Sequence, residues 1–99
     1  MEAYDLNLGQ IVRSAAGRDK GKFFLIVEIA DNEFVKICDG ERRKINISKR
    51  KKKRHLKKTN HVVYELKERL EKGQRISDAE IRRYLEDYRN NTLIENGGI

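Results

Sequence analysis

Runs of apolar residues in the first half of the chain predict short β-strands. Gln10–Ser14 (QIVRS) is a brief candidate, and Lys22–Ile29 (KFFLIVEI) gives the strongest signal because it is rich in β-branched and aromatic residues. Alternation places the odd-numbered residues from Phe23 to Ile29 on one face and the even-numbered residues on the other. Both faces are largely apolar, which is typical of a central strand in a small, tightly curled sheet.

Two further strands are predicted on either side of a tight turn. Phe34–Cys38 (FVKIC) is one strand, and Asp39-Gly40 indicates a hairpin because Gly adopts a positive φ without strain. The returning strand is Arg42–Ile47 (RRKINI), whose two isoleucines are expected to face inward. Four such strands within about forty residues predict a small antiparallel barrel.

After Lys58 the spacing of apolar residues changes to that of a helix. The first helix carries an apolar stripe at Val62, Val63, Leu66 and Leu70. Thr59 or Asn60 is expected to cap its start, and Gly73 its end.

A second helix is predicted by the segment Ile76–Ile81 (ISDAEI). Ser77 and Glu80 form a capping box, and the isoleucines at the two ends of the segment take the positions of a hydrophobic staple. The helix then carries an apolar stripe at Ile81, Tyr84, Leu85 and Tyr88. It is expected to end at Asn90–Asn91, before a loose tail over residues 92–99.

The predicted fold class is α+β, with a small antiparallel β-barrel followed by a C-terminal helical hairpin. Residues 1–58 are assigned to the barrel and its basic loop, with residues 1–8 as a short leader. Residues 59–99 are assigned to the hairpin and tail. A chain of 99 residues buries a modest core and has little room for a deep catalytic cleft.

Positive charge is concentrated in one segment, which we call the basic run. Eleven of the 23 Lys and Arg residues lie between Arg42 and Lys58, where Asp and Glu are absent, and the other twelve are outnumbered by 16 acidic residues. The net charge of +7 is therefore a dense patch, which attracts a polyanion such as a phosphate backbone. Its cations are Arg42, Arg43, Lys44, Lys49, Arg50, Lys51, Lys52, Lys53, Arg54, Lys57 and Lys58.

The composition predicts a protein of the reducing cytoplasm. Cys38 is the only cysteine, so an intramolecular disulfide is excluded, and its apolar neighbours favour a buried core position. The start of the chain is acidic and lacks the apolar core of a signal peptide. No apolar run approaches the roughly 20 residues that a membrane-spanning helix needs.

A glycine-containing basic turn, residues 16–22 (AGRDKGK), is a candidate phosphate-binding loop. Its glycines let the backbone approach a phosphate closely, and its basic side chains add charge. The candidate residues are Gly17, Arg18, Lys20, Gly21 and Lys22. An ordinary β-turn with solvated side chains explains the local spacing equally well. The turn is neither a Walker motif nor a dinucleotide fingerprint.

Several segments, in this order, resemble a KOW motif. They are residues 9–12 (GQIV), 16–28 (AGRDKGKFFLIVE) and 35–40 (VKICDG), with the basic run closing at His55-Leu56. Over residues 8–58 the chain is similar to bacterial KOW-domain RNA-binding proteins, which resemble large-subunit ribosomal proteins of the fourteen-e type. The loop alone is less specific, because transcription elongation factors carry it as well. Residues 60–99 lie outside this match.

The resemblance implies an SH3-like barrel that binds ribosomal RNA or the ribosome, with no catalysis and no cofactor. With this resemblance, we expect an RNA-binding role for the five loop candidates, the eleven cations of the basic run and His55. A permanent ribosomal protein and a transient factor both fit this description.

The stretch Lys49–Arg54 (KRKKKR) has other interpretations: a solvated loop, a nuclear-import signal or a contact with anionic lipid. Phosphate contact is favoured because a KOW-type barrel adjoins the stretch, and the lipid interpretation is weakest because no amphipathic anchor does. The stretch contains no aromatic residue. We therefore expect recognition of folded RNA by backbone and shape, with Tyr84 and Tyr88 in a helix core.

Neither an enzyme nor a metal site is expected. His55 and His61 are six residues apart and Cys38 is seventeen from the nearer, which matches no zinc spacing. The rival hypothesis is an adaptor: residues 60–90 would bind a protein of a translation or transcription complex, and the basic run would only anchor it to nucleic acid. A role on DNA is a third possibility, and the oligomeric state is left open.

Overall fold

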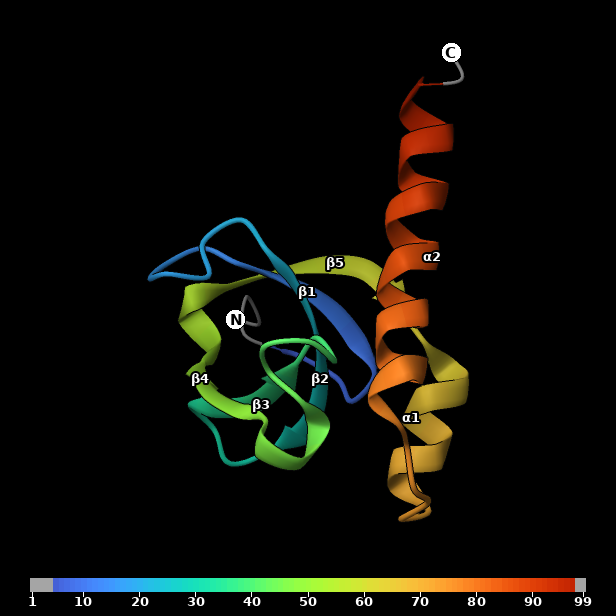
Figure 1. Ribbon diagram of the computed structural model, residues 1–99. Coiled ribbons are helices and arrows are strands. Elements are labelled where there is room, and N and C mark those ends of the chain that lie inside the picture. The colour runs from blue at the N-terminus through green and yellow to red at the C-terminus, as the bar shows by residue number, and fades with distance from the viewer. Residues whose placement is uncertain (1–4, 98–99) are drawn as a thin grey trace.

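The computed structural model describes the backbone of residues 5–97 and the side chains of residues 5–91. This part of the chain contains five strands and two helices (Figure 1). They are β1 (Gln10–Ser14), β2 (Phe23–Ile29), β3 (Phe34–Cys38), β4 (Lys49–Lys52), β5 (Leu56–Val62), α1 (Tyr64–Glu71) and α2 (Asp78–Gly97). The predicted α+β class is confirmed.

The strands form one antiparallel sheet in the order β4-β3-β2-β1-β5. Two register shifts, between Gln10 and Val12 and between Ile26 and Glu28, bend the sheet as β-bulges do. The sheet is open, with β4 and β5 as its edge strands. A short 3₁₀ helix, Lys53–His55, joins these two strands along the chain.

Alternation along the central strands gives the sheet two apolar faces. Phe24 and Ile26 belong to one core cluster with Val12, and Leu25 belongs to a second cluster with Ile11. These five side chains are fully buried, and each contributes about 1.5–3 kcal/mol by leaving water. The predicted division of Lys22–Ile29 between two faces is confirmed, although Ile29 at its end is 39 % exposed.

The two helices cover the second of these faces. Leu66 of α1 and Ile81 and Leu85 of α2 are buried in the cluster that contains Ile11 and Leu25. Figure 1 shows α1 beside the first turns of α2, while the C-terminal part of α2 extends past the sheet. The apolar stripe predicted for the second helix therefore faces the sheet, as do Leu66 and Leu70 of the first, whereas Val62 belongs to β5 and Val63 precedes α1. No helix within residues 5–97 has the length and apolarity needed to cross a membrane.

Local signals are confirmed for the start of the second helix and for the end of the first. The Ser77 hydroxyl accepts a hydrogen bond from the backbone N–H of Glu80 at 3.1 Å, and the Glu80 carboxylate accepts one from the Ser77 N–H at 3.1 Å. Gly73 follows α1 with a φ of +71°. The predicted N-cap of the first helix is wrong: Thr59 and Asn60 lie in β5, and α1 begins after Val63 without a side-chain cap.

Two other segments differ from the sequence prediction. Residues 42–47 are not a strand: they form a turn and a 3₁₀ helix, Ile45–Ile47, in which Ile47 is 70 % exposed. The returning strand is instead β4, and β5 follows it, so much of the basic run is strand rather than loop. The reason is a contact with α2, where the Asp78 carboxylate accepts a hydrogen bond from the Ile45 N–H at 2.8 Å.

The ends of the chain also differ from expectation. Leu6 belongs to the first core cluster and is 8 % exposed, so residues 5–8 are part of the fold rather than a leader; residues 1–4 lie outside the described part. Helix α2 passes through Asn90–Asn91 and continues to Gly97, where a tail was predicted. The division between residues 58 and 59 falls inside β5.

Candidate nucleic-acid interface

The loop between β1 and β2 is closed by backbone hydrogen bonds. The Ser14 N–H donates to the Lys22 carbonyl at 2.9 Å, and the Gly21 N–H donates to the Ser14 carbonyl at 2.8 Å. Gly17 and Gly21 have φ values of +81° and +90°, which a side chain would strain. The Ala15 N–H donates to the His55 carbonyl at 2.8 Å, so the loop lies against the connection between β4 and β5.

Asp19 joins this loop to the basic run. Its carboxylate is 3.4 Å from Arg43 Nη2 and 3.5 Å from Lys49 Nζ, and its side chain is only 7 % exposed. Burial opposes ionisation of this carboxyl, but the charges of Arg43 and Lys49 outweigh it and hold the pKa of Asp19 below its ordinary value. The anion therefore positions two cations that the sequence assigned to RNA.

Lys51 is the cation of the basic run that points inward. It is 8 % exposed, and its Nζ donates a hydrogen bond to the Ala16 carbonyl at 3.2 Å. Burial lowers the pKa of Lys51, and the neighbouring charges of Lys49 and Arg43 lower it further. Its ammonium group thus holds the β1–β2 loop through this hydrogen bond, and little of the side chain is accessible to a ligand.

Arg50 is held on a different part of the sheet. Its guanidinium is 3.5 Å from the Asp31 carboxylate and stacks 3.8 Å above the centre of the Phe34 ring. Among the side chains of residues 5–91, the ion pairs of the basic run go to Asp19 and Asp31. Within that range, none goes to the acidic residues of the helices.

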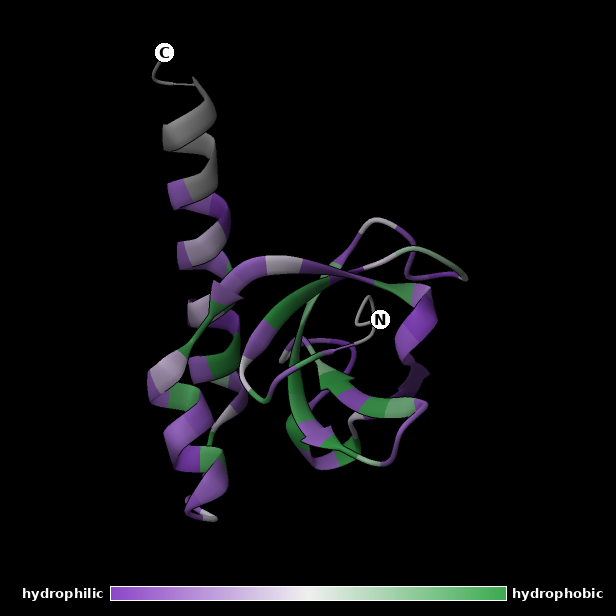
Figure 2. Ribbon diagram, turned by 180° about the vertical axis from the view of Figure 1, so that it is seen from behind, coloured by the Kyte–Doolittle hydropathy of each residue, from purple (hydrophilic) through white to green (hydrophobic). Residues whose placement is uncertain are grey.

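Most of the other predicted binding residues remain accessible. The exposed ones are Arg18, Lys20, Lys22, Arg42, Lys44, Arg54, Lys57 and Lys58. The partly buried ones are Arg43, Lys49, Lys52, Lys53 and His55. In Figure 2, most of β5 and the 3₁₀ helix that precedes it are coloured as hydrophilic.

Arg13 is a cation at this surface that the sequence analysis did not select. It is exposed on β1 and pairs across the sheet with Lys57 of β5. Together with Lys20 of the β1–β2 loop, these side chains line a hollow of about 270 Å³ whose lining contains no acidic residue. The sequence did contain a signal, because Arg13 is the one charged residue of the strand QIVRS.

Three aromatic side chains of the sheet–helix core, Phe23, Tyr84 and Tyr88, do not line this hollow. Tyr88 of α2 contacts Phe23 edge-to-face, with ring centres 5.5 Å apart, and its ring centre is 5.4 Å from that of His61. Tyr84 and Tyr88 pack against the sheet–helix core, as predicted. Within the described residues, no cluster of three or more His, Cys, Asp or Glu side chains is arranged to hold a metal ion.

No family model matches this chain, and no curated protein matches it.

Proposed function

We propose that the protein is a non-catalytic RNA-binding protein that binds ribosomal RNA or the ribosome. Its binding surface comprises the β1–β2 loop, the β4–β5 connection and β5, on an open, bent sheet that we take as the counterpart of the SH3-like barrel of KOW domains. The resemblance of residues 8–58 to KOW-domain proteins supports the proposal, and so does the bent antiparallel sheet. The observation that carries it is the hollow lined by Arg13, Lys20 and Lys57.

Three cations around one hollow without an acid repel one another. An external polyanion relieves this repulsion and releases its own counterions, so binding is favoured most at low salt. A phosphate in the hollow can contact both β-strands and the loop at once. The surrounding accessible cations, including Arg18, Lys58 and Arg54, extend this surface along a nucleic-acid backbone.

The rival adaptor hypothesis gains no support from the described residues. An adaptor needs an apolar helix stripe that a partner can cover. Leu66, Ile81 and Leu85 are instead buried against the sheet. We therefore propose no second function.

The test compares two triple variants of equal net charge. One is Arg13→Gln/Lys20→Gln/Lys57→Gln, and the matched control, Lys72→Gln/Arg75→Gln/Arg83→Gln, neutralises three exposed cations near the helices. Binding to an RNA hairpin is measured between 50 and 200 mM salt, a range over which wild-type affinity is expected to fall by on the order of 10³ for about six phosphate contacts.

The hollow variant is expected to lose on the order of 10² in affinity and to show a salt slope shallower by about three, one for each lost contact. The control is expected to stay close to wild type. Equal losses in both variants would show that only net charge matters and would contradict the proposed surface. A duplex DNA of the same sequence measures any preference for RNA.

A further inference from the structure

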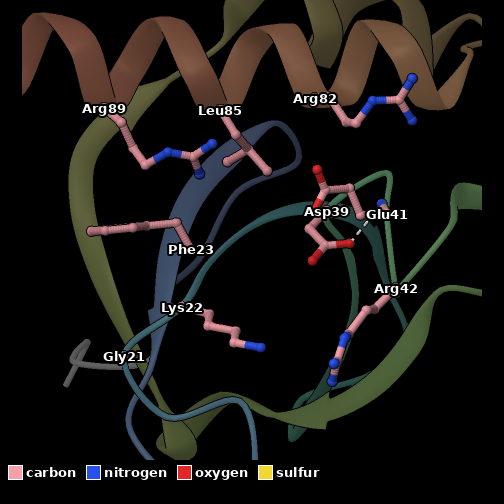
Figure 3. Close-up of a pocket in the computed structure, with 9 residues that line it drawn as sticks. All are labelled: Gly21, Lys22, Phe23, Asp39, Glu41, Arg42, Arg82, Leu85 and Arg89. Carbon is pink, nitrogen blue, oxygen red and sulfur yellow. Dashed lines mark hydrogen bonds between the residues drawn. The ribbon is translucent and has the colours of Figure 1, made fainter.

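A second hollow, of about 400 Å³, lies between the sheet and helix α2 (Figure 3). Three segments far apart in the sequence form it: the end of the β1–β2 loop, the turn at residues 39–42 and one face of α2. Phe23 and Leu85 give it an apolar wall. Its volume falls within the range of small-molecule sites.

The walls of this hollow are held in place by long-range contacts. Arg82 donates a hydrogen bond to the Gly40 carbonyl at 2.7 Å, and the Ile45 N–H donates to the Asp78 carboxylate. Gly40 approaches α2 so closely that a Cβ there would lie 2.5 Å from the Asp78 carbonyl oxygen. The turn is thus fixed on the helix before any ligand arrives, which lowers the entropic cost of binding.

The lining contains charges of both signs. Figure 3 shows Lys22, at the end of the β1–β2 loop, and Arg89 of α2 on either side of Phe23, with Arg42 across the hollow from Lys22. Two carboxylates lie across from Phe23. Asp39 uses Oδ1 to accept the N–H groups of Glu41 and Arg43 at 2.9 Å, whereas no partner within residues 5–91 engages the Glu41 carboxylate.

A ligand that suits this lining has an anionic group, a flat apolar body and N–H donors. A nucleotide has all three. Lys22, Arg42 and Arg89 supply the lining with cations for a phosphate, and Phe23 supplies an apolar wall for the base. Guanine is the base that presents two adjacent donors, N1–H and the N2 amino group, which match the two oxygens of one carboxylate.

The position of Gly21 connects this hollow to the candidate RNA surface. Gly21 lines both the hollow at Phe23 and the hollow at Arg13. A Cβ at Gly21 would find Arg13 Nη2 as its nearest neighbour, at 3.9 Å, so the space beside this glycine is not filled by other side chains. An RNA strand whose phosphate occupies the first hollow can therefore direct its next unpaired base into the second.

We propose that the hollow at Phe23 binds a single unpaired guanosine of the RNA, with Glu41 as the residue that reads the base. This inference rests on the proposed RNA-binding function. It adds base selectivity, supplied by helix α2 and the 39–42 turn, to a surface that otherwise binds backbone.

The test uses the full chain and three RNA hairpins: fully paired, with one bulged guanosine, and with one bulged uridine. Wild type is expected to bind the guanosine bulge about tenfold more tightly than the other two. Glu41→Gln is expected to remove this preference. Because Glu41→Gln also raises the net positive charge, simple electrostatics predicts tighter binding of all three hairpins, so selective weakening identifies base recognition.

The control variant is Glu86→Gln, which makes the same charge change at an exposed site on α2. It is expected to keep the preference for the guanosine bulge. Equal affinity of wild type for the two bulges, or an undiminished preference in Glu41→Gln, would overturn the inference while leaving binding of the paired hairpin, and hence the proposed function, intact.

A titration with guanosine monophosphate decides the inference even if none of the hairpins binds. The backbone N–H resonances of Gly21 and Gly40 are expected to shift with this nucleotide and much less with uridine monophosphate at the same concentration, because both nucleotides carry the phosphate and only guanine presents two adjacent donors. Absence of a shift, or the same shift with uridine monophosphate, refutes a guanosine site. Failure of the hairpins alone refutes the proposed function.

Discussion

Asp19 limits the number of cations in the basic run that are free to meet an external anion. It contacts Arg43 and Lys49, and Lys51 lies buried beside this pair. Buried charges in contact are costly to separate, because each then lacks the partner that offset its lost hydration. The charge density read from the sequence therefore includes cations whose first role is to fix the β1–β2 loop on β4.

Replacing Asp19 with Asn is expected to destabilise the fold by about 1–2 kcal/mol, since Arg43 and Lys49 lose their anion beside the buried Lys51. Urea unfolding at neutral pH measures the change. Asp31→Asn is the matched control, because Asp31 pairs with Arg50 in an exposed position. A control variant destabilised as much as Asp19→Asn would show that burial of the anion is unimportant.

Cys38 gives a second prediction for a single residue. Burial raises the pKa of the Cys38 thiol to about 12, and the charges of Asp78 and Asp39 act in the same direction. At pH 8 the reactive thiolate is therefore scarce and covered. Alkylation by iodoacetamide is expected to be slow in the native protein and rapid in 8 M urea, roughly as for a free thiol. Rapid native alkylation would contradict the burial of Cys38.

At the scale of elements, the pairing of the two edge strands gives the cations of the basic run defined positions on the sheet. Pairing of β4 with β3 turns Lys51 inward, and pairing of β5 with β1 sets Lys57 opposite Arg13. The connection between α1 and α2 is also held by a particular pair of side chains. Arg69 pairs with Glu80, the same residue that completes the capping box of α2.

The Glu80 carboxyl is expected to contribute to acid unfolding. Hydrogen bonds from Arg69 and from Ser77 lower its pKa from 4.5 to about 2. A depressed pKa means that the unfolded state binds the proton first, so the contribution of Glu80 is present above pH 4.5 and is lost as the pH falls towards 2. Glu80→Gln should therefore lose less stability than wild type over this interval.

Urea midpoints at a series of pH values measure this difference, with Glu86→Gln as the control. The control is expected to retain the wild-type pH dependence. If Glu80→Gln instead follows the wild-type curve in parallel, Glu80 is not the group that titrates.

At the scale of the whole molecule, the helices complete the core of the sheet. Ile81 of α2 is fully buried with Ile11, Leu25 and Cys38, although α2 begins forty residues after β3 ends. The sheet and the helices therefore share the second of the two core clusters, the one that contains Ile11 and Leu25. Deleting residues 74–99 would expose the sheet face that Ile81 and Leu85 cover.

Ile81→Ala is expected to reduce the free energy of unfolding by about 2–5 kcal/mol, the range for a large aliphatic residue removed from a core. Ile29→Ala, at a site 39 % exposed on β2, is the matched control and is expected to cost much less. Both are measured by urea unfolding. Equal costs at the two sites would contradict a shared core.

The sequence predicted those features whose causes are local. The first three strands follow from alternation, and the start of α2 follows from the capping box at Ser77 and Glu80. Helix α2 passes Asn90–Asn91 because Asn is only slightly unfavourable inside a helix. Local signals therefore located the start of α2 and the end of α1, but not the start of α1 or the end of α2.

The errors arose where distant segments meet. The 3₁₀ helix at residues 45–47 depends on Asp78, thirty-three residues away from Ile45, so no local pattern indicates it. At the candidate site, the loop and the basic run were identified from composition. The inward position of Lys51 and the pairing of Arg13 with Lys57 required the strand register. The sequence indicated the candidate surface, and the register determined which side chains reach it.

The cations on β4 and β5 have a consequence independent of any ligand. These strands form the two borders of an open sheet, where free backbone N–H and C=O groups can recruit a strand from another molecule. Lysines such as Lys52 and Lys58 repel the same border of a second copy and so oppose intermolecular β-aggregation. Neutralising them should therefore lower the concentration at which the protein precipitates, even in buffers that contain no RNA.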